Sequence, residues 1–207
     1  MTNEALLKIV EDGLKGDIAT VTALFKLKEE LTENIRLELL KKSGTKSNDI
    51  TIIKRITKEA KQNPKFDKAH EFTFEGIQYF GFLEGHYILA SENDFGYEHA
   101  NESDKFDINA LISPDMFYNT EFKTEFKVDM IDLKLVWKTQ KKSDKTPYVI
   151  NIEGIKIGVN PFYLLDAVQF NDTDKIIVNI KNLNAPIMIR NDIKKTIGIV
   201  LPIRLKD

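Results

Sequence analysis

Two short stretches near the end of the chain decide how its last part folds: VNPFYLLDAV at residues 159–168 and IVLPIRL at residues 199–205. In the first, Asn160 is a preferred N-cap residue and Pro161 suits the first helical position, so a strand is predicted to run directly into a helix. In the second, Pro202 interrupts an apolar strand, because proline has no backbone N–H to donate to a sheet. A strand that ends in an uncharged, proline-bearing apolar tip indicates a surface that contacts another molecule.

The composition is that of an ordinary globular protein. A chain of 207 residues, 42% hydrophobic and 30% charged, can bury a core in one or two domains. The formal net charge of −2 creates no overall positive field toward nucleic acid, so phosphate contacts require a local patch. The absence of cysteine suits a reducing, cytoplasmic location. No secretory signal is recognisable, and no apolar run approaches the roughly 20 residues that cross a bilayer.

Helical spacing of apolar residues recurs along the chain at intervals of roughly 50 residues. In the segment of residues 19–42, residues 19–28 (ATVTALFKLK) favour a strand, whereas residues 33–42 (ENIRLELLKK) fit either a strand or a helix. The four predicted helices are residues 2–15, which end at Gly16; residues 51–62, after the possible caps Asn48 and Asp49; residues 109–119, shortened by Pro114; and a helix that starts at Asn160.

Strand patterns occupy the segments between these helices. Residues 70–91 predict two or three strands separated by glycines, and residues 120–140 alternate apolar with polar side chains as strands do. Residues 148–159 predict a hairpin that turns at Glu153 and Gly154. Three further strands follow the fourth helix. The sequence therefore predicts an α+β fold that repeats a unit of one helix and about three strands, with helices packed on antiparallel sheets.

The order of motifs in the last part of the chain resembles the bacterial DNA polymerase III β subunit, the sliding clamp. That family ends in a strand, an N-P-x-Y-L-L-D-A-L helix, three strands with S-P-I in the second, and a terminal L-P-V-R-L. The corresponding segments here are NPFYLLDA at residues 160–167, API at 185–187 and LPIRL at 201–205. LEGHYILA at residues 83–90 is similar to the family's T-D-G-H-R-L-A strand, and IKRITKEA at residues 53–60 resembles the preceding helix. The first 48 residues show no resemblance.

The resemblance implies a DNA-clamp-like fold in two domains, residues 1–104 and 105–207. Family members arrange six similar domains in a ring around duplex DNA and tether a polymerase to it. Two domains per chain would require three copies, so the protein is expected to be a homo-oligomer. Its function is then that of a processivity factor in DNA replication, without cofactor or catalytic residues, and the short chain suggests a phage or mobile-element origin.

A basic helix is the first candidate site. Ile52, Ile53, Ile56 and Ala60 share one side of the helix, and cationic residues spread over the other. Such a helix would anchor to a sheet and present cations to the backbone of double-stranded DNA without reading its sequence. An ordinary solvated surface explains the pattern equally well. The residues expected to bind DNA are Lys54, Arg55, Lys58 and Lys61.

The second candidate site is a partner-peptide groove at the C-terminal tip, which the family uses to bind Gln/Leu/Phe-rich peptides of polymerases and other proteins. Apolar anchors with a few orienting polar groups are usual in such grooves. Alternatively, Leu201 and Ile203 are core residues of an edge strand. The groove residues carried over by matching positions are His86, Leu89, Asn160, Tyr163, Pro186, Leu201, Pro202 and Ile203.

Enzymatic signals are weak. His70, His86 and His99 lack metal-ligand spacing, and neither a phosphate-binding glycine loop nor a nucleophile elbow is present. The prediction is therefore a protein that is not an enzyme and binds no metal. Two alternatives remain: a clamp-fold interaction or regulatory protein that forms no ring and mimics or modulates a host clamp, and an enzyme that uses the His- and Asp-rich middle segment.

Overall fold

The structure is a computed structural model that describes residues 3–16, 19–42, 44–60, 68–84, 86–101, 108, 123–140 and 146–205. The chain divides into two compact units, residues 1–50 and residues 51–207. The expected domain boundary between residues 104 and 105 falls among residues 102–107, outside the described residues, and it stays a prediction.

The first unit contains a helical hairpin of α1 (Asn3–Leu14) and α2 (Thr20–Lys42). Gly16, with a φ of +78°, follows α1, as the sequence predicted. Gly13 permits the close packing of the two helices, because a Cβ there would lie 2.8 Å from the Cβ of Ala23. Helix α2 corrects the strand favoured for residues 19–28 and decides the open choice for residues 33–42, because the many Leu, Lys and Glu residues are good helix formers.

Helix α3 (Ser47–Ala60) begins earlier than the sequence predicted. Asn48 and Asp49 are therefore not caps but belong to the first helical turn, where an acidic residue is favoured by the helix dipole. The side chains of Ile52, Ile53 and Ile56 are buried, as the helical wheel predicted. The far end of the predicted helix, residues 61 and 62, lies outside the described residues.

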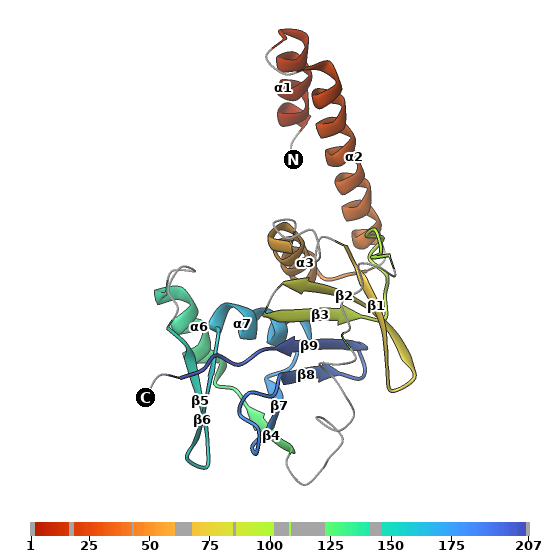
Figure 1. The fold of residues 1–207 in the computed structure, drawn as a ribbon. Coiled ribbons are helices and arrows are strands. Elements are labelled where there is room, and N and C mark those ends of the chain that lie inside the picture. The colour runs from red at the N-terminus through yellow and green to blue at the C-terminus, as the bar shows by residue number, and fades with distance from the viewer. Residues whose placement is uncertain are drawn as a thin grey trace. The chain divides into compact units, whose positions relative to one another are not determined.

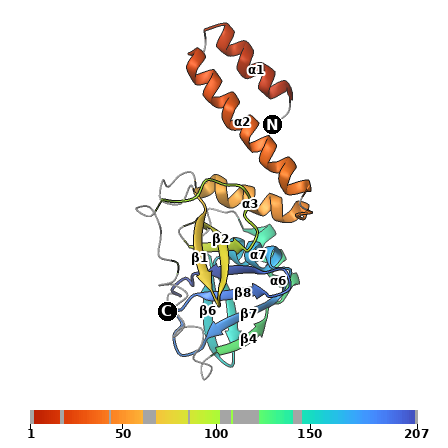
Figure 2. The same ribbon diagram turned by 90° about the vertical axis from the view of Figure 1, so that its right-hand side faces the viewer.

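The second unit contains an antiparallel seven-stranded sheet in the order β1-β2-β3-β9-β8-β7-β4. Strands β4 and β1 lie at its opposite ends (Figures 1 and 2). The pairing of β3 with β9 joins segments that are far apart in the sequence, with Leu89 opposite Gly198. The strands are β1 (His70–Phe74), β2 (Ile77–Glu84), β3 (Tyr87–Ser91), β4 (Lys123–Lys127), β7 (Lys175–Asn179), β8 (Ile187–Asn191) and β9 (Thr196–Val200).

A separate hairpin, β5 (Tyr148–Ile152) and β6 (Ile155–Val159), forms the second sheet. It turns at Glu153 and Gly154, as predicted. Both turn residues have positive φ, +52° and +89°, which is the geometry of the two-residue turn that matches the twist of a hairpin.

Helix α6 (Met130–Thr139) corrects the prediction that residues 120–140 form strands throughout. Among residues 123–140 of this segment, which the structure describes, only β4 is a strand. The Oδ1 of Asp129 accepts hydrogen bonds from the backbone N–H groups of Ile131 (2.9 Å) and Asp132 (3.0 Å), so it caps the helix. The helix predicted at residues 109–119 lies outside the described residues.

Helix α7 (Pro161–Phe170) lies directly on the sheet. Asn160 is its N-cap, as predicted, and the Asn160 Oδ1 accepts a hydrogen bond from the Phe162 N–H at 2.9 Å. Gly198 of β9 allows the close approach, because a Cβ there would lie 2.8 Å from the Nδ2 of Asn171 and 2.9 Å from the Cβ of Ala167. The predicted α+β fold with helices packed on antiparallel sheets is confirmed, and α3 and α7 each precede three strands.

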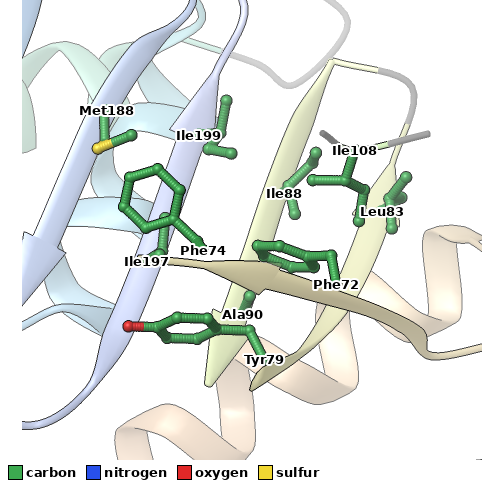
Figure 3. Packing of buried hydrophobic residues seen from close by; sticks show 10 residues of the cluster. All are labelled: Phe72, Phe74, Tyr79, Leu83, Ile88, Ala90, Ile108, Met188, Ile197 and Ile199. Carbon is green, nitrogen blue, oxygen red and sulfur yellow. The ribbon is translucent and has the colours of Figure 1, made fainter. Parts of the chain in front are cut away.

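The sheet of the second unit carries an apolar core cluster, shown in Figure 3. The rings of Phe72 and Tyr79, which are opposite each other on β1 and β2, stack with centroids 5.6 Å apart. Along β3 and β9 alternate residues belong to this cluster, and the residues between them, such as Gly198, lie on the face that α7 covers. The cluster consists of Phe72, Phe74, Tyr79, Leu83, Ile88, Ala90, Ile108, Met188, Ile197 and Ile199.

Candidate interaction surface

The segment that follows β9 connects the two sheets of the second unit. The Leu201 N–H donates to the carbonyl oxygen of His86, at the start of β3, over 2.9 Å. Two residues later, the Ile203 N–H donates to the carbonyl oxygen of Gly158 in β6, over 2.7 Å. Pro202 lies between these two donors and has no N–H of its own, so the chain can leave one sheet and join the other at this residue.

Gly158 makes the second of these contacts possible. A Cβ at this position would lie 2.8 Å from the carbonyl oxygen of Ile203 and 2.7 Å from the Cδ2 of Leu205. Real Cβ atoms do not approach other atoms so closely, so any larger residue would push the terminal segment away from β6.

An aromatic stack supports the start of α7 beside this segment. The ring of Tyr163 lies parallel to that of Tyr87, with centroids 4.4 Å apart and an interplanar angle of 12°. The His86 ring is 6.3 Å from Tyr163 on a similar plane. Tyr87 is buried, whereas Tyr163 is half-buried. Such stacking holds an apolar ring in a defined orientation.

Six of the eight predicted groove residues are exposed or half-buried. Tyr163 and Asn160 start α7, His86 precedes β3, and the others belong to the terminal segment. We call this set the carboxy-terminal rim: His86, Asn160, Tyr163, Leu201, Pro202 and Ile203.

The other two predicted groove residues are buried. Leu89 is fully buried, because it lies on the face of β3 that the helices cover, opposite Gly198. Pro186 is also buried, immediately before β8. Neither side chain is part of the accessible surface of this structure, and their place in a peptide groove stays a prediction.

The predicted DNA-binding residues separate into different environments. Lys54 and Lys58 are exposed on α3, as predicted. Arg55 instead forms an ion pair with Asp166 of α7: its Nε lies 2.9 Å from Oδ2, and its second terminal nitrogen bonds Oδ1. Because Asp166 is buried, this pair fastens α3 to α7 and engages the guanidinium of Arg55, whose side chain stays partly exposed. Lys61 lies outside the described residues.

The sequence analysis missed two exposed cations, Lys134 and Lys138, because their segment was interpreted as a strand. The signal that could have identified the helix is Asp129, an N-cap residue followed by apolar residues at helical spacing. It also missed the role of Asp166, for which no local pattern signals a partner in α3.

Among the described residues, no group of three or more His, Asp or Glu side chains is arranged to hold a metal ion. His99 lies between Glu71 and Asp94, with its Nδ1 2.6 Å from a Glu71 oxygen and its Nε2 3.4 Å from an Asp94 oxygen. None of the helices described is both long and apolar enough to cross a bilayer.

Comparison with known proteins finds no matching family model and no match among curated proteins. Solved structures that are similar to the chain are sliding clamps, the family that its carboxy-terminal motifs resemble. A candidate DNA polymerase III beta subunit of Eubacterium rectale is 18% identical, with a TM-score of 0.49, over 76% of this chain and 64% of that chain. The beta subunit of Caulobacter crescentus is 11% identical, with a TM-score of 0.45, over 67% and 58%.

The beta subunit of Thermotoga maritima is 20% identical, with a TM-score of 0.36, over 62% of this chain and 42% of that chain. The chain covers less than two thirds of each of these three proteins, and the likeness is one of fold.

Proposed function

We propose that the chain is a sliding-clamp-like processivity factor of DNA replication, not an enzyme, that tethers partner proteins through the carboxy-terminal rim. The observation that carries the proposal is the meeting of three motifs that are separate in the sequence. Residues 160–167 form the N-cap and the larger part of α7. Ile187 pairs with Val200, the last residue before the terminal segment, and the Ile203 N–H donates to the carbonyl oxygen of Gly158 in β6, the strand that precedes α7.

The rim has the chemistry that a short apolar peptide requires. Leu201, Pro202 and Ile203 are half-buried, and Tyr163 adds part of an aromatic ring. A peptide of the Gln/Leu/Phe type would bury its apolar side chains on these residues, and the neighbouring His86 and Asn160 would fix its orientation. Apolar anchors with a few polar groups are the usual design of such peptide sites.

Fluorescence anisotropy with a labelled Gln/Leu/Phe-type peptide tests this proposal. The wild type is expected to bind with micromolar affinity, and the double variant Tyr163→Ala/Leu201→Ala is expected to lose binding. The control is Ile193→Ala, which removes an apolar side chain that is 98% exposed on the turn between β8 and β9, away from the rim residues. Equal affinity of the double variant and the control would contradict the assignment, provided that circular dichroism shows both to be folded.

DNA binding is a separate part of the proposal. Exposed Lys54 and Lys58 on α3, with Lys134 and Lys138 on α6, would contact phosphates of double-stranded DNA without reading bases, in a ring that several copies of the chain form. The variant Lys54→Glu/Lys58→Glu is expected to abolish salt-dependent binding to duplex DNA. Lys156→Glu, the same change at an exposed position of β6, is the control. DNA binding that is equally strong in the wild type, in Lys54→Glu/Lys58→Glu and in Lys156→Glu would exclude α3 as the DNA-facing helix.

A second candidate function is a clamp-fold interaction protein that forms no ring and modulates a host clamp. The observation that favours it is α7, which has no Lys or Arg and whose Asp166 is already paired with Arg55. Sedimentation distinguishes the candidates. A monomer at all micromolar concentrations without salt-dependent DNA binding supports the second, and a closed oligomer supports the first.

A further inference from the structure

The α1–α2 hairpin leaves an apolar stripe of α2 exposed along nearly the whole helix. α1 has 12 residues and α2 has 23, so α1 can run alongside only about half of α2. Ala23, which packs against α1, lies about 80° to 160° around the helix from the side chains of the stripe, at 100° per residue. The apolar side chains on this side are between 46% and 63% exposed: Val21, Leu24, Phe25, Leu31, Ile35 and Leu39.

The spacing of the stripe is that of a helix–helix seam. Positions 21, 24, 28, 31, 35 and 38 follow one another in steps of three or four residues, which is the heptad pattern of paired helices. Four of these positions are apolar. The other two are Lys28 and Glu38, both exposed, and the next position in the series is the exposed Lys42 at the end of α2. A charged residue at a seam position selects register and orientation, because its partner must compensate it.

We propose that α2 pairs with α2 of a second copy of this chain, antiparallel and centred on residue 33. In that register, residues equally distant from 33 face each other across the two-fold axis. Lys28 then faces Glu38 of the second copy, and Leu31 faces Ile35, twice each by symmetry. A parallel pair would instead place Lys28 against Lys28 and Glu38 against Glu38, which are repulsive contacts.

This complementarity identifies a second copy as the occupant of the stripe. One register pairs Lys28 with Glu38 and also pairs the apolar positions between them, and at the helix ends it places the aliphatic stem of Lys42 beside Leu24. The inference does not rest on the proposed function, since the stripe belongs to residues 20–42, upstream of both the rim and the cations of α3.

Disulfide trapping tests the register, because the chain contains no cysteine of its own. A mixture of full-length Leu31→Cys and Ile35→Cys chains is expected to form a mixed disulfide dimer under mild oxidation, and neither variant alone is expected to do so. Bridging of Leu31→Cys chains with each other would indicate a parallel pair. No bridging in the mixture would show that residues 31 and 35 of the two copies are not in contact. Either result overturns the proposal.

Reversing the charges at residues 28 and 38 tests the same helix–helix contact without a covalent bond. In sedimentation equilibrium of the full chain, Lys28→Glu is expected to weaken association at least about tenfold, because two Glu–Glu contacts replace two Lys–Glu contacts. Adding Glu38→Lys to the same chain should restore it. Lys26→Glu is the matched control, since this exposed cation lies on another side of α2. Equal weakening by Lys26→Glu, or no recovery in the double variant, would contradict the inference.

Discussion

Arg55 of α3 and Asp166 of α7, 111 residues apart in the sequence, form an ion pair with two hydrogen bonds. Asp166 is buried, with a side chain that is 4% exposed, whereas the Arg55 side chain is 36% exposed. The arginine therefore supplies a positive charge and two donors to the buried carboxylate. The pair therefore connects α3, which precedes β1, β2 and β3, to α7, which precedes β7, β8 and β9.

Arg55→Ala is expected to destabilise the fold by about 2 kcal/mol or more, because it removes a positive charge and two hydrogen bonds from a buried carboxylate. Urea unfolding measures the change. Lys54→Ala, which removes an exposed neighbouring cation, should change stability by less than about 0.5 kcal/mol. The double variant Arg55→Leu/Asp166→Leu should recover much of the loss, since no charge remains buried. Equal stability of Arg55→Ala and Lys54→Ala would show that the pair contributes little.

Gly198→Ala is expected to destabilise the second unit by about 1–3 kcal/mol, because the added Cβ would overlap Ala167 and Asn171 and push α7 from the sheet. Thermal or urea unfolding measures it. The matched test is Ala167→Gly combined with Gly198→Ala, in which the Cβ–Cβ overlap disappears. The combined loss should then be smaller than the sum of the single losses. Additive losses would indicate that the two positions do not touch.

Gly158→Ala is expected to detach the terminal segment without unfolding the sheet. The new Cβ would meet the backbone oxygen of Ile203, which cannot move aside independently of the chain. Hydrogen exchange at the Ile203 amide should become faster, while exchange at β9 amides such as Ile199 stays slow. Adding Leu205→Ala removes the side-chain overlap but not the backbone one, so exchange should remain fast. Slow exchange at Ile203 in Gly158→Ala would contradict the role given to this glycine.

The raised pKa of Tyr148 predicts that the folded protein loses stability at alkaline pH. Burial, followed by the negative charge of Asp132, raises the pKa of Tyr148 from 10.0 to about 12. The unfolded chain therefore loses this proton at lower pH than the folded protein. The stabilising contribution is fully present below about pH 10 and is lost as the pH rises from about 10 through 12.

Urea unfolding of the wild type and of Tyr148→Phe, at about pH 9 and about pH 11.5, measures this contribution. The wild type should lose more stability between the two pH values than the variant, because only the wild type has a hydroxyl to ionise at this position. Lysines and the other tyrosines titrate in both proteins and cancel in the comparison. Equal losses would assign the pH dependence to those other groups.

Much of the fold near the chain's end could be predicted because its signals are local. Asn160 and Pro161 start α7, and Glu153 and Gly154 turn the hairpin, through bonds and dihedral angles of the residues themselves. In residues 120–140 two local patterns compete. The alternation of apolar and polar residues favoured strands and led to the wrong prediction, whereas the N-cap residue Asp129 marks the start of the helix that forms.

The candidate site was predictable in its position along the chain but not in its exposure. Tyr163 and Leu201 lie at the surface as expected, whereas Leu89 is buried, because only the pairing of β3 with β9 decides which face of β3 the helices cover. A single sequence contains no signal for a pairing between strands so far apart.

By itself, then, the sequence determined where α7 begins, where the hairpin turns and which apolar residues follow the last strand, since neighbouring residues dictate these features. Only the tertiary structure decided that Arg55 neutralises Asp166 and that the terminal segment joins two sheets through His86 and Gly158. The physical reason is that a buried charge and a backbone N–H each need a partner, and the fold supplies that partner from distant parts of the chain.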